Sequence, residues 1–246
     1  MRLIIYGTNT INEAILSGAV KDRVFVSEKK QKSGLIDKGL LELLKKNGIG
    51  VYPKKDEAFI SEFGKEAFVK GIAGVADYRE YGYEDILALP KHDSPPFYLI
   101  LDGITDPRNF GAIIRTGNCA GLSGIIIPKN NSIGITSAAA NVSQGALFYT
   151  PVAAVVNIAR VIDDLKKRGV WVVGLSNEGN EDIYSMDFTV PLSLVVGSEG
   201  RGLRRLTSSK CEKILKIPMM GNVNSLNASA SFAVCAYEIL RQRLSR

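Results

Sequence analysis

Residues 97–128 read FYLILDGITDPRNFGAIIRTGNCAGLSGIIIP, and this stretch decides the fold class of the chain. It begins with an apolar run at 97–102 and ends with a second, β-branched run at 124–128. Such runs, bounded by glycine and proline, are typical of strands that are covered on both faces of a sheet. The segment between them has helical character, so the stretch predicts a strand, a helix and a second, parallel strand.

The same rhythm continues towards the C-terminus. Further apolar runs predict strands at residues 170–176, 192–197 and 213–218. Residues 157–169 carry one apolar helical face, and the last segment carries another, formed by Ala228, Phe232, Ala236, Ile239 and Leu240. Alternating strands and helices favour an α/β domain with a doubly wound parallel sheet over residues 97–246.

A smaller α/β region precedes this domain. Residues 1–76 alternate short apolar strands with helical patterns and carry 13 basic against 9 acidic residues. Their lysines, among them Lys29, Lys30 and Lys32, gather in loops and at helix ends, where they either bind a polyanion or form a solvated rim. Residues 77–96 have two basic and five acidic residues and end in Pro95-Pro96, so we expect a linker there.

Composition excludes several classes of protein. The 246 residues carry 31 basic and 25 acidic side chains, a net charge of +6 that suits a polyanionic partner such as RNA. No apolar run reaches the ~18–20 residues that span a bilayer, and the N-terminus lacks a signal peptide's apolar core, so we expect a cytoplasmic protein. Three scattered cysteines and the single histidine, His92, match no metal-binding spacing, which predicts a site without metal.

Three polar, glycine-containing segments follow predicted strands, where ligands bind in sheets of this type. The first reads DPRNFGAIIRT, residues 106–116. Asn109 in the turn and Arg115 in the helix could point at one ligand. Alternatively, Asn109 caps the helix and Arg115 faces solvent.

The second segment reads VVGSEGRGLRRL, residues 195–206. Its glycines at 197, 200 and 202 allow close backbone approach or positive φ, and the Glu199 carboxylate could reach nearby amides. The arginines at 201, 204 and 205 suit phosphate contact, with a solvated helix as the alternative. The pattern is not GxGxxG, which argues against a nucleotide-dependent oxidoreductase.

The third segment reads IPMMGNVNSLNASAS, residues 217–231. Ser225 and Asn227 are good helix caps. The crowding of asparagine, serine and Gly221 exceeds what one cap requires and indicates a small-molecule site.

Together, the three segments resemble the three motifs of the SpoU (TrmH-type) RNA 2′-O-methyltransferases of the SPOUT superfamily, in the same order and with similar spacing. The N-terminal region is similar to the substrate-binding domain of members that act on ribosomal RNA. Taken along the chain, the resemblance is strongest to the members that methylate guanosine in bacterial large-subunit ribosomal RNA. The resemblance implies a ribosomal-protein-like RNA-binding domain at 1–76 and a C-terminal SPOUT domain with a parallel sheet and a deep trefoil knot. It also implies S-adenosylmethionine as cofactor and a homodimer with the active site near its interface.

The resemblance also assigns roles to individual residues. The catalytic set it implies is Asn109, Arg115, Glu199, Ser225 and Asn227. The cofactor set is Gly197, Ile217, Met219, Gly221 and Leu226. The expected RNA contacts are Lys29, Lys30, Lys32, Arg201, Arg204 and Arg205.

The sequence therefore predicts methylation of a ribose 2′-hydroxyl in large-subunit ribosomal RNA, with guanosine as the expected nucleotide. Transfer RNA, or another ribosomal RNA nucleotide, is the alternative substrate. A non-catalytic RNA-binding or ribosome-assembly protein is the alternative from another class, and the complete motif set argues against it.

Overall fold

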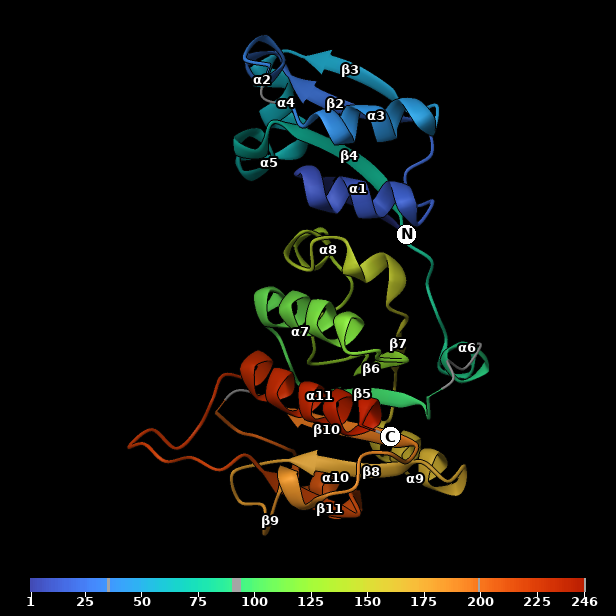
Figure 1. Cartoon of the computed structure of the whole chain (residues 1–246), viewed down its shortest axis with the longest axis vertical. Coiled ribbons are helices and arrows are strands. Elements are labelled where there is room, and N and C mark those ends of the chain that lie inside the picture. The colour runs from blue at the N-terminus through green and yellow to red at the C-terminus, as the bar shows by residue number, and fades with distance from the viewer. Residues whose placement is uncertain (35, 90–93, 199, 246) are drawn as a thin grey trace. The chain divides into compact units, whose positions relative to one another are not determined.

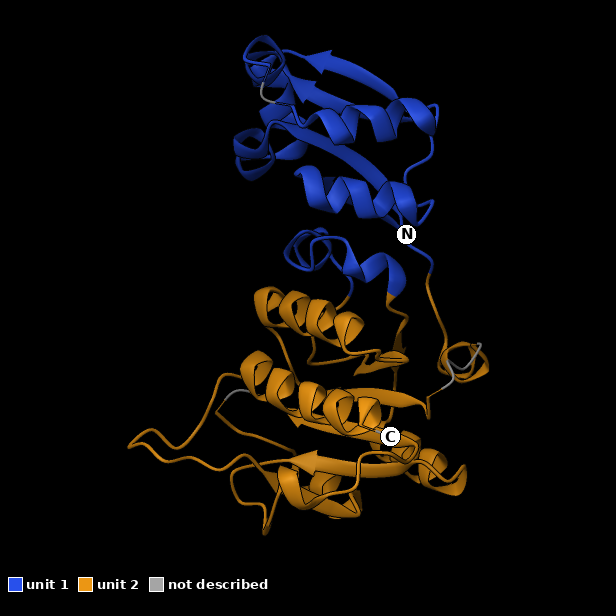
Figure 2. Ribbon diagram, viewed as in Figure 1, with its two compact units in different colours: residues 1–79, 135–149 blue, residues 80–134, 150–246 orange. Residues whose placement is uncertain are grey.

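The structure is a computed structural model of the whole chain and describes residues 1–34, 36–89, 94–198 and 200–245 (Figure 1). The chain divides into two compact units (Figure 2). Unit 1 comprises residues 1–79 and 135–149, and unit 2 comprises residues 80–134 and 150–246. His92 lies outside the described residues.

Unit 2 is built on a seven-stranded sheet in the order β7-β6-β5-β10-β8-β11-β9. The strands are β5 (Phe97–Asp102), β6 (Gly124–Pro128), β7 (Val152–Val155), β8 (Trp171–Leu175), β9 (Glu181–Asp182), β10 (Leu192–Gly197) and β11 (Lys213–Lys216). Each neighbouring pair is parallel. The predicted α/β domain with a parallel sheet is confirmed, and β7 and β9 are additions that the sequence analysis missed.

Helices cover both faces of this sheet. They are α6 (Tyr83–Ala88), α7 (Pro107–Cys119), α9 (Ile158–Lys167), α10 (Arg205–Lys210) and α11 (Ala228–Leu244), with a 3₁₀ turn at Ile183–Ser185. On one face, the predicted apolar side of α9 packs against Tyr98 and Ile100 of β5 and against Val195 of β10. On the other face, α7 and α11 lie side by side (Figure 1).

The apolar stripe of α11 belongs largely to the core of unit 2. Phe232, Ala236 and Ile239 are fully buried, and the Phe232 ring stacks on Phe97 of β5 with 6.4 Å between ring centroids. Burial of this kind stabilises a large aromatic side chain by about 1.5–3 kcal/mol relative to exposure. Tyr237 and Leu244 remain exposed on the same helix.

Unit 1 contains a four-stranded mixed sheet in the order β1-β4-β2-β3. The strands are β1 (Arg2–Tyr6), β2 (Arg23–Ser27), β3 (Gly50–Lys54) and β4 (Ile72–Asp77), and the helices are α1 (Thr8–Leu16), α2 (Glu28–Lys32), α3 (Lys38–Lys46), α4 (Asp56–Phe63) and α5 (Lys65–Lys70). β4 runs antiparallel to both β1 and β2, and β2 and β3 are parallel. A small α/β region with β1, β2, β3, α1 and α3 matches the sequence pattern.

A second piece of chain completes unit 1, with α8 (Ser137–Val142) and a 3₁₀ turn at Ala146–Tyr149. The backbone N–H groups of Ile4 and Tyr6 in edge strand β1 donate to Ser137 Oγ and Asn141 Oδ1, each at 2.8 Å. The Asn141 amide returns a hydrogen bond to the Ile4 carbonyl at 3.0 Å. The sequence analysis placed residues 135–149 within the C-terminal domain, whereas their contacts group them with unit 1, because their polar side chains pair the open edge of β1.

No helix in the described part of the chain is long and apolar enough to cross a membrane.

Candidate functional site

The three polar segments converge at the carboxyl ends of the sheet of unit 2. β5 and β10 are neighbours, and their last residues, Asp102 and Gly197, are register partners. The first segment follows β5, the second follows β10, and the third follows β11 two strands away. Parallel strands end at one edge, so this topology brings residues far apart in sequence to the same place.

The loop after β10 is folded back tightly onto the strand end. Ser198 and Gly202 exchange two backbone hydrogen bonds, at 3.1 and 2.9 Å. A Cβ atom at Gly197 would lie only 2.2 Å from the Gly202 carbonyl carbon, and Gly200 and Gly202 have φ of 79° and 63°. Positive φ, one of the two expected roles of these glycines, is confirmed at Gly200 and Gly202, whereas close approach of the backbone to a ligand stays a prediction.

A cavity of about 690 Å³ lies beside this loop. We call it the carboxyl-edge cavity. Its lining includes Gly197, Ile217, Met219, Ser225, Leu226 and Asn227, so six of the predicted catalytic and cofactor residues meet there. Gly221 does not line it and is exposed.

The same cavity has a wall that the sequence analysis missed. Residues 175–178, which read LSNE, also line the cavity; Leu175 is the last residue of β8, and the other three follow it. The sequence pattern that would have identified this turn was present, because its polar residues follow an apolar strand, as the other three segments do.

Asn109 and Asn227 are joined directly. The Asn227 amide Nδ2 donates to Asn109 Oδ1 at 2.9 Å, and Asn109 is 9% exposed. Asn227 is also the N-cap of α11, since its Oδ1 accepts from the backbone N–H groups of Ser229 and Ala230 at 2.8 and 3.3 Å. Asn227 therefore both caps a helix and links two motifs.

Asn109 is not the cap of α7. That position belongs to Asp106, whose carboxylate accepts from the Arg108 backbone N–H at 2.8 Å. This hydrogen bond, assisted by the Arg108 guanidinium, lowers the pKa of the Asp106 carboxyl below its usual value. Because Asp106 does the capping, the side chain of Asn109 is left to contact Asn227.

Arg115 lies on the exposed side of α7 and lines neither the carboxyl-edge cavity nor the second cavity described below. It lies six positions after Asn109, which turns the two side chains about 120° apart around the helix axis. Within one protomer, the two residues do not converge on one cavity. Glu199 lies outside the described residues.

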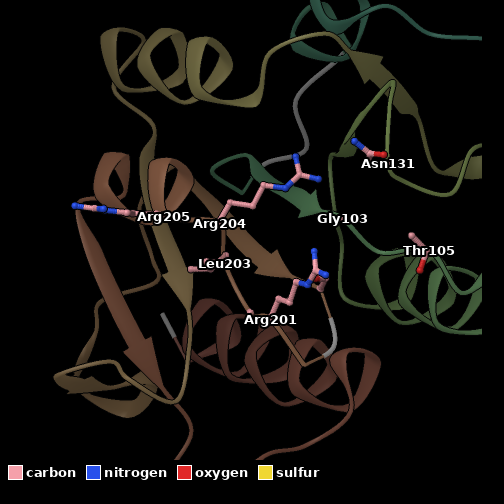
Figure 3. Close-up of a pocket in the computed structure, with 9 residues that line it drawn as sticks. Gly103, Thr105, Asn131, Arg201, Leu203, Arg204 and Arg205 are labelled. Carbon is pink, nitrogen blue, oxygen red and sulfur yellow. The ribbon is translucent and has the colours of Figure 1, made fainter.

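A second cavity, of about 800 Å³, adjoins the first. We call it the arginine cavity, and its lining includes Gly103, Thr105, Asn131, Arg201, Arg204 and Arg205. Figure 3 shows Arg201 and Arg204 reaching towards Gly103, whereas the side chain of Arg205 extends away from these two. The described residues contain no group of three or more histidine, cysteine, aspartate or glutamate side chains that could hold a metal ion.

The predicted RNA-binding lysines all lie on helix α2 of unit 1. Lys29 and Lys32 are exposed, and Lys30 is half-buried. The aliphatic stem of Lys30 lies over Gly71, where a Cβ atom would come 2.0 Å from Lys30 Cγ. Its ammonium group is thereby carried on a stem that packs against the start of β4.

Comparison with known proteins gives the family of the chain. The model of the SpoU rRNA Methylase family matches residues 96–237, which include all three segments. The chain belongs to this family. The family match thus covers the sheet of unit 2, both cavities and most of α11.

Individual relatives extend the similarity beyond the SpoU domain. The 23S rRNA (guanosine-2′-O-)-methyltransferase RlmB of Haemophilus influenzae is 38% identical over 242 residues, which cover 98% of each chain. The crystal structure of the SpoU methyltransferase AviRb from Streptomyces viridochromogenes, in complex with AdoMet, is similar in fold, with a TM-score of 0.81 and 24% identity over 100% of this chain and 92% of that one. The A. aeolicus TrmH/SpoU tRNA modifying enzyme is 26% identical with a TM-score of 0.57, over 62% of this chain and 77% of that one.

Proposed function

We propose that this SpoU family member transfers a methyl group from S-adenosylmethionine to a ribose 2′-hydroxyl, that of a guanosine in large-subunit ribosomal RNA. One observation carries the proposal, namely the carboxyl-edge cavity, where Gly197, Ser225 and Asn227 from separate motifs meet. The similarity to an RlmB protein over 98% of both chains supports the choice of substrate.

The residues of the carboxyl-edge cavity suit this cofactor. When bound, S-adenosylmethionine supplies an electrophilic methyl group on a sulfonium centre. The cavity's volume of about 690 Å³ is within the range of sites for such molecules. Ile217, Met219 and Leu226 provide apolar surface, Gly197 allows backbone approach, and Ser225 and Asn227 add polar groups. Gly221 would act from the same loop without lining the cavity.

The protein must also help the 2′-hydroxyl to lose its proton as the new O–C bond forms. Arg115 is the residue proposed for this step. A guanidinium has a pKa above ~12 and is a poor base, so we propose that Arg115 orients the neighbouring phosphate and lowers the pKa of the hydroxyl. The hydroxyl proton then leaves to phosphate or water. General-base action by Arg115 itself is the competing mechanism.

Arg115 lies away from the cavity of its own protomer, so the proposal includes a second copy of the chain. In a homodimer, Arg115 on the exposed side of α7 would complete the carboxyl-edge cavity of the partner. Tyr237 and Leu244, exposed at 52% and 76% on neighbouring α11, offer apolar surface for such an interface. Glu199 is proposed to hold the loop after β10, and a deep trefoil knot in the C-terminal domain belongs to the same proposal.

Unit 1 is proposed to bind the RNA backbone through Lys29, Lys30 and Lys32. The similarity to the RlmB protein of Haemophilus influenzae covers nearly the full chain and therefore also the residues of unit 1. This favours a role of unit 1 in the choice of substrate. Replacing all three lysines by glutamate should weaken RNA binding at least tenfold and leave cofactor affinity unchanged, because phosphate contacts supply most of the electrostatic affinity. Equal loss of cofactor affinity would contradict the assignment.

The direct test is incubation with tritiated S-adenosylmethionine and separate unmodified pools of ribosomal and transfer RNA. Label in large-subunit RNA that protects one linkage from alkaline hydrolysis would establish ribose methylation. Label in transfer RNA alone would favour the second candidate, which the similarity to the A. aeolicus tRNA modifying enzyme supports. If the protein binds the cofactor but labels neither the two RNA pools nor ribosome assembly intermediates, the result would favour a non-catalytic RNA-binding protein of the cytoplasm.

A further inference from the structure

A buried carboxylate lies beside the arginine cavity. Asp102, the last residue of β5, is 1% exposed. The backbone N–H of Arg204 donates to Asp102 Oδ2 at 3.3 Å, and Arg204 Nη1 lies 3.4 Å from Asp102 Oδ1. Asp102 Oδ1 accepts no hydrogen bond from the described residues, so the guanidinium of Arg204 is the charge that compensates its burial.

Gly103, the next residue, lies beside that guanidinium. It has a φ of 94°, and a Cβ atom there would lie 3.5 Å from Arg204 Nη2. The ion pair with Asp102 keeps the half-exposed Arg204 side chain over the hollow that Arg201 also faces (Figure 3). Arg204 is thus held before any ligand arrives, which lowers the entropy lost when it binds an anion.

The two cavities share one wall. Ser198, Arg201, Gly202 and Leu203 line both of them. A group bound in the arginine cavity is therefore the immediate neighbour of a group in the carboxyl-edge cavity. Arginine pairs with phosphate through two parallel N–H···O bonds, and threonine and asparagine side chains also donate to phosphate oxygens.

We propose that the arginine cavity is a binding site for one RNA phosphodiester next to the ribose that is methylated, with Arg204 and Arg201 as its ligands and Asp102 as a positioning residue for Arg204. The inference rests on the proposed function and deepens it. Thr105 and Asn131 complete the polar lining. A carboxylate of the cofactor is the other anion that this chemistry would accept, and the test below separates the two.

The test compares Arg204→Ala with Arg160→Ala, an exposed arginine of α9 that lines neither cavity. Equilibrium binding of an unmodified large-subunit RNA transcript is measured over a range of salt, and cofactor affinity is measured by calorimetry. We expect Arg204→Ala to weaken RNA binding on the order of ten- to a hundredfold and to reduce the salt slope by about one. Cofactor affinity should stay within about twofold in both variants, as should RNA affinity in Arg160→Ala.

A second pair of variants tests the role of Asp102. If Asp102 acts by holding Arg204, Asp102→Asn should weaken RNA binding, and the double variant Asp102→Asn/Arg204→Ala should bind RNA as Arg204→Ala alone does. A merely structural role of Asp102 would instead give additive losses and weaken cofactor binding as well. Unchanged cofactor affinity in Asp102→Asn also shows that the variant is folded.

Two results would overturn the inference. Weaker cofactor binding by Arg204→Ala with unchanged RNA affinity would assign the cavity to the cofactor's carboxylate. Equal effects of Arg204→Ala and Arg160→Ala on RNA affinity would show that Arg204 contributes only general positive surface charge and that the arginine cavity is not a specific phosphate site. The measurements of RNA binding and cofactor binding do not require methyl transfer. If the wild-type protein transfers no methyl group, the proposed function is refuted, and the binding measurements still decide whether the phosphate site exists.

Discussion

Asn227 donates a hydrogen bond to Asn109 across 2.9 Å, joining the first turns of two helices that are 118 residues apart in sequence. The same side chain caps α11 through its oxygen. One residue therefore both starts a helix and fixes its position relative to α7. The two roles can be separated by substitution, because capping needs only a short oxygen-bearing side chain.

Asn227→Ser should keep the cap and lose the link, since the serine side chain is too short to reach Asn109. We expect methyl transfer to fall by roughly three- to tenfold, the range of one neutral hydrogen bond, with little change in thermal midpoint. Asn227→Ala should lose both and additionally lower the free energy of unfolding by about 1 kcal/mol. Equal activity of Asn227→Ser and wild type would show that the link does not matter for the reaction.

Gly197→Ala should prevent the loop after β10 from closing. The new methyl group would collide with the Gly202 carbonyl group, which is backbone and cannot rotate aside. We expect cofactor affinity to fall at least ~tenfold and the free energy of unfolding to fall by about 1–3 kcal/mol. Calorimetric titration with S-adenosylmethionine is the measurement.

The control for this variant is Gly169→Ala. Gly169 follows α9, has a φ of 77° and has no atom within 4 Å of its would-be Cβ. Alanine there should cost about 1–2 kcal/mol through backbone strain and leave cofactor affinity unchanged. If both variants lose cofactor affinity equally, the loss reflects general destabilisation instead of loop closure.

Strands formed by runs of large apolar residues were predictable, and strands interrupted by alanine and glycine were not. β5, β6, β8, β10 and β11 follow the apolar runs in the sequence. β4 reads IAGVAD and β7 reads VAAV, and alanine and glycine have weak strand propensity. β4 is stabilised by its neighbours, since it pairs with β1 and β2 and Gly74 lies against Val24.

The site was predictable where motifs follow strand ends, and less so where it depends on tertiary contacts. Gly197, Ser225 and Asn227 lie in one cavity because the topology of a parallel sheet requires their strands to end together. The attachment of residues 135–149 to unit 1 depends on hydrogen bonds from Ser137 and Asn141 to β1. No local pattern in the sequence records such long-range contacts.

Cys235 should report on the packing of α11. It is fully buried, and burial together with the nearby Glu238 charge raises the pKa of its thiol to about 12. A raised pKa keeps the thiol protonated, so at pH 8 only roughly one in ten thousand would be thiolate. We expect no reaction of Cys235 with a thiol-specific disulfide reagent until guanidinium unfolds the protein, whereas exposed Cys119 reacts in the native state. Prompt native-state labelling of Cys235 would show that α11 detaches from the core.

Arg115 gives the sharpest test of a shared active site. At a cofactor concentration well below the Kd of Gly197→Ala, both Arg115→Ala and Gly197→Ala should have little activity as homodimers. The first lacks the group that acts on the hydroxyl, and the second binds the cofactor weakly. A purified heterodimer of the two variants distinguishes the arrangements. If Arg115 acts on the partner's cavity, one of the two sites contains both an intact Gly197 and an intact Arg115. The heterodimer should then recover about half of the wild-type rate, since one site in two is complete.

If Arg115 serves its own protomer, each site carries one defect and the heterodimer should be as inactive as its parents. Separately tagged, co-expressed chains assayed with tritiated cofactor give the measurement, and a wild-type/Gly197→Ala heterodimer is the matched control for one working site.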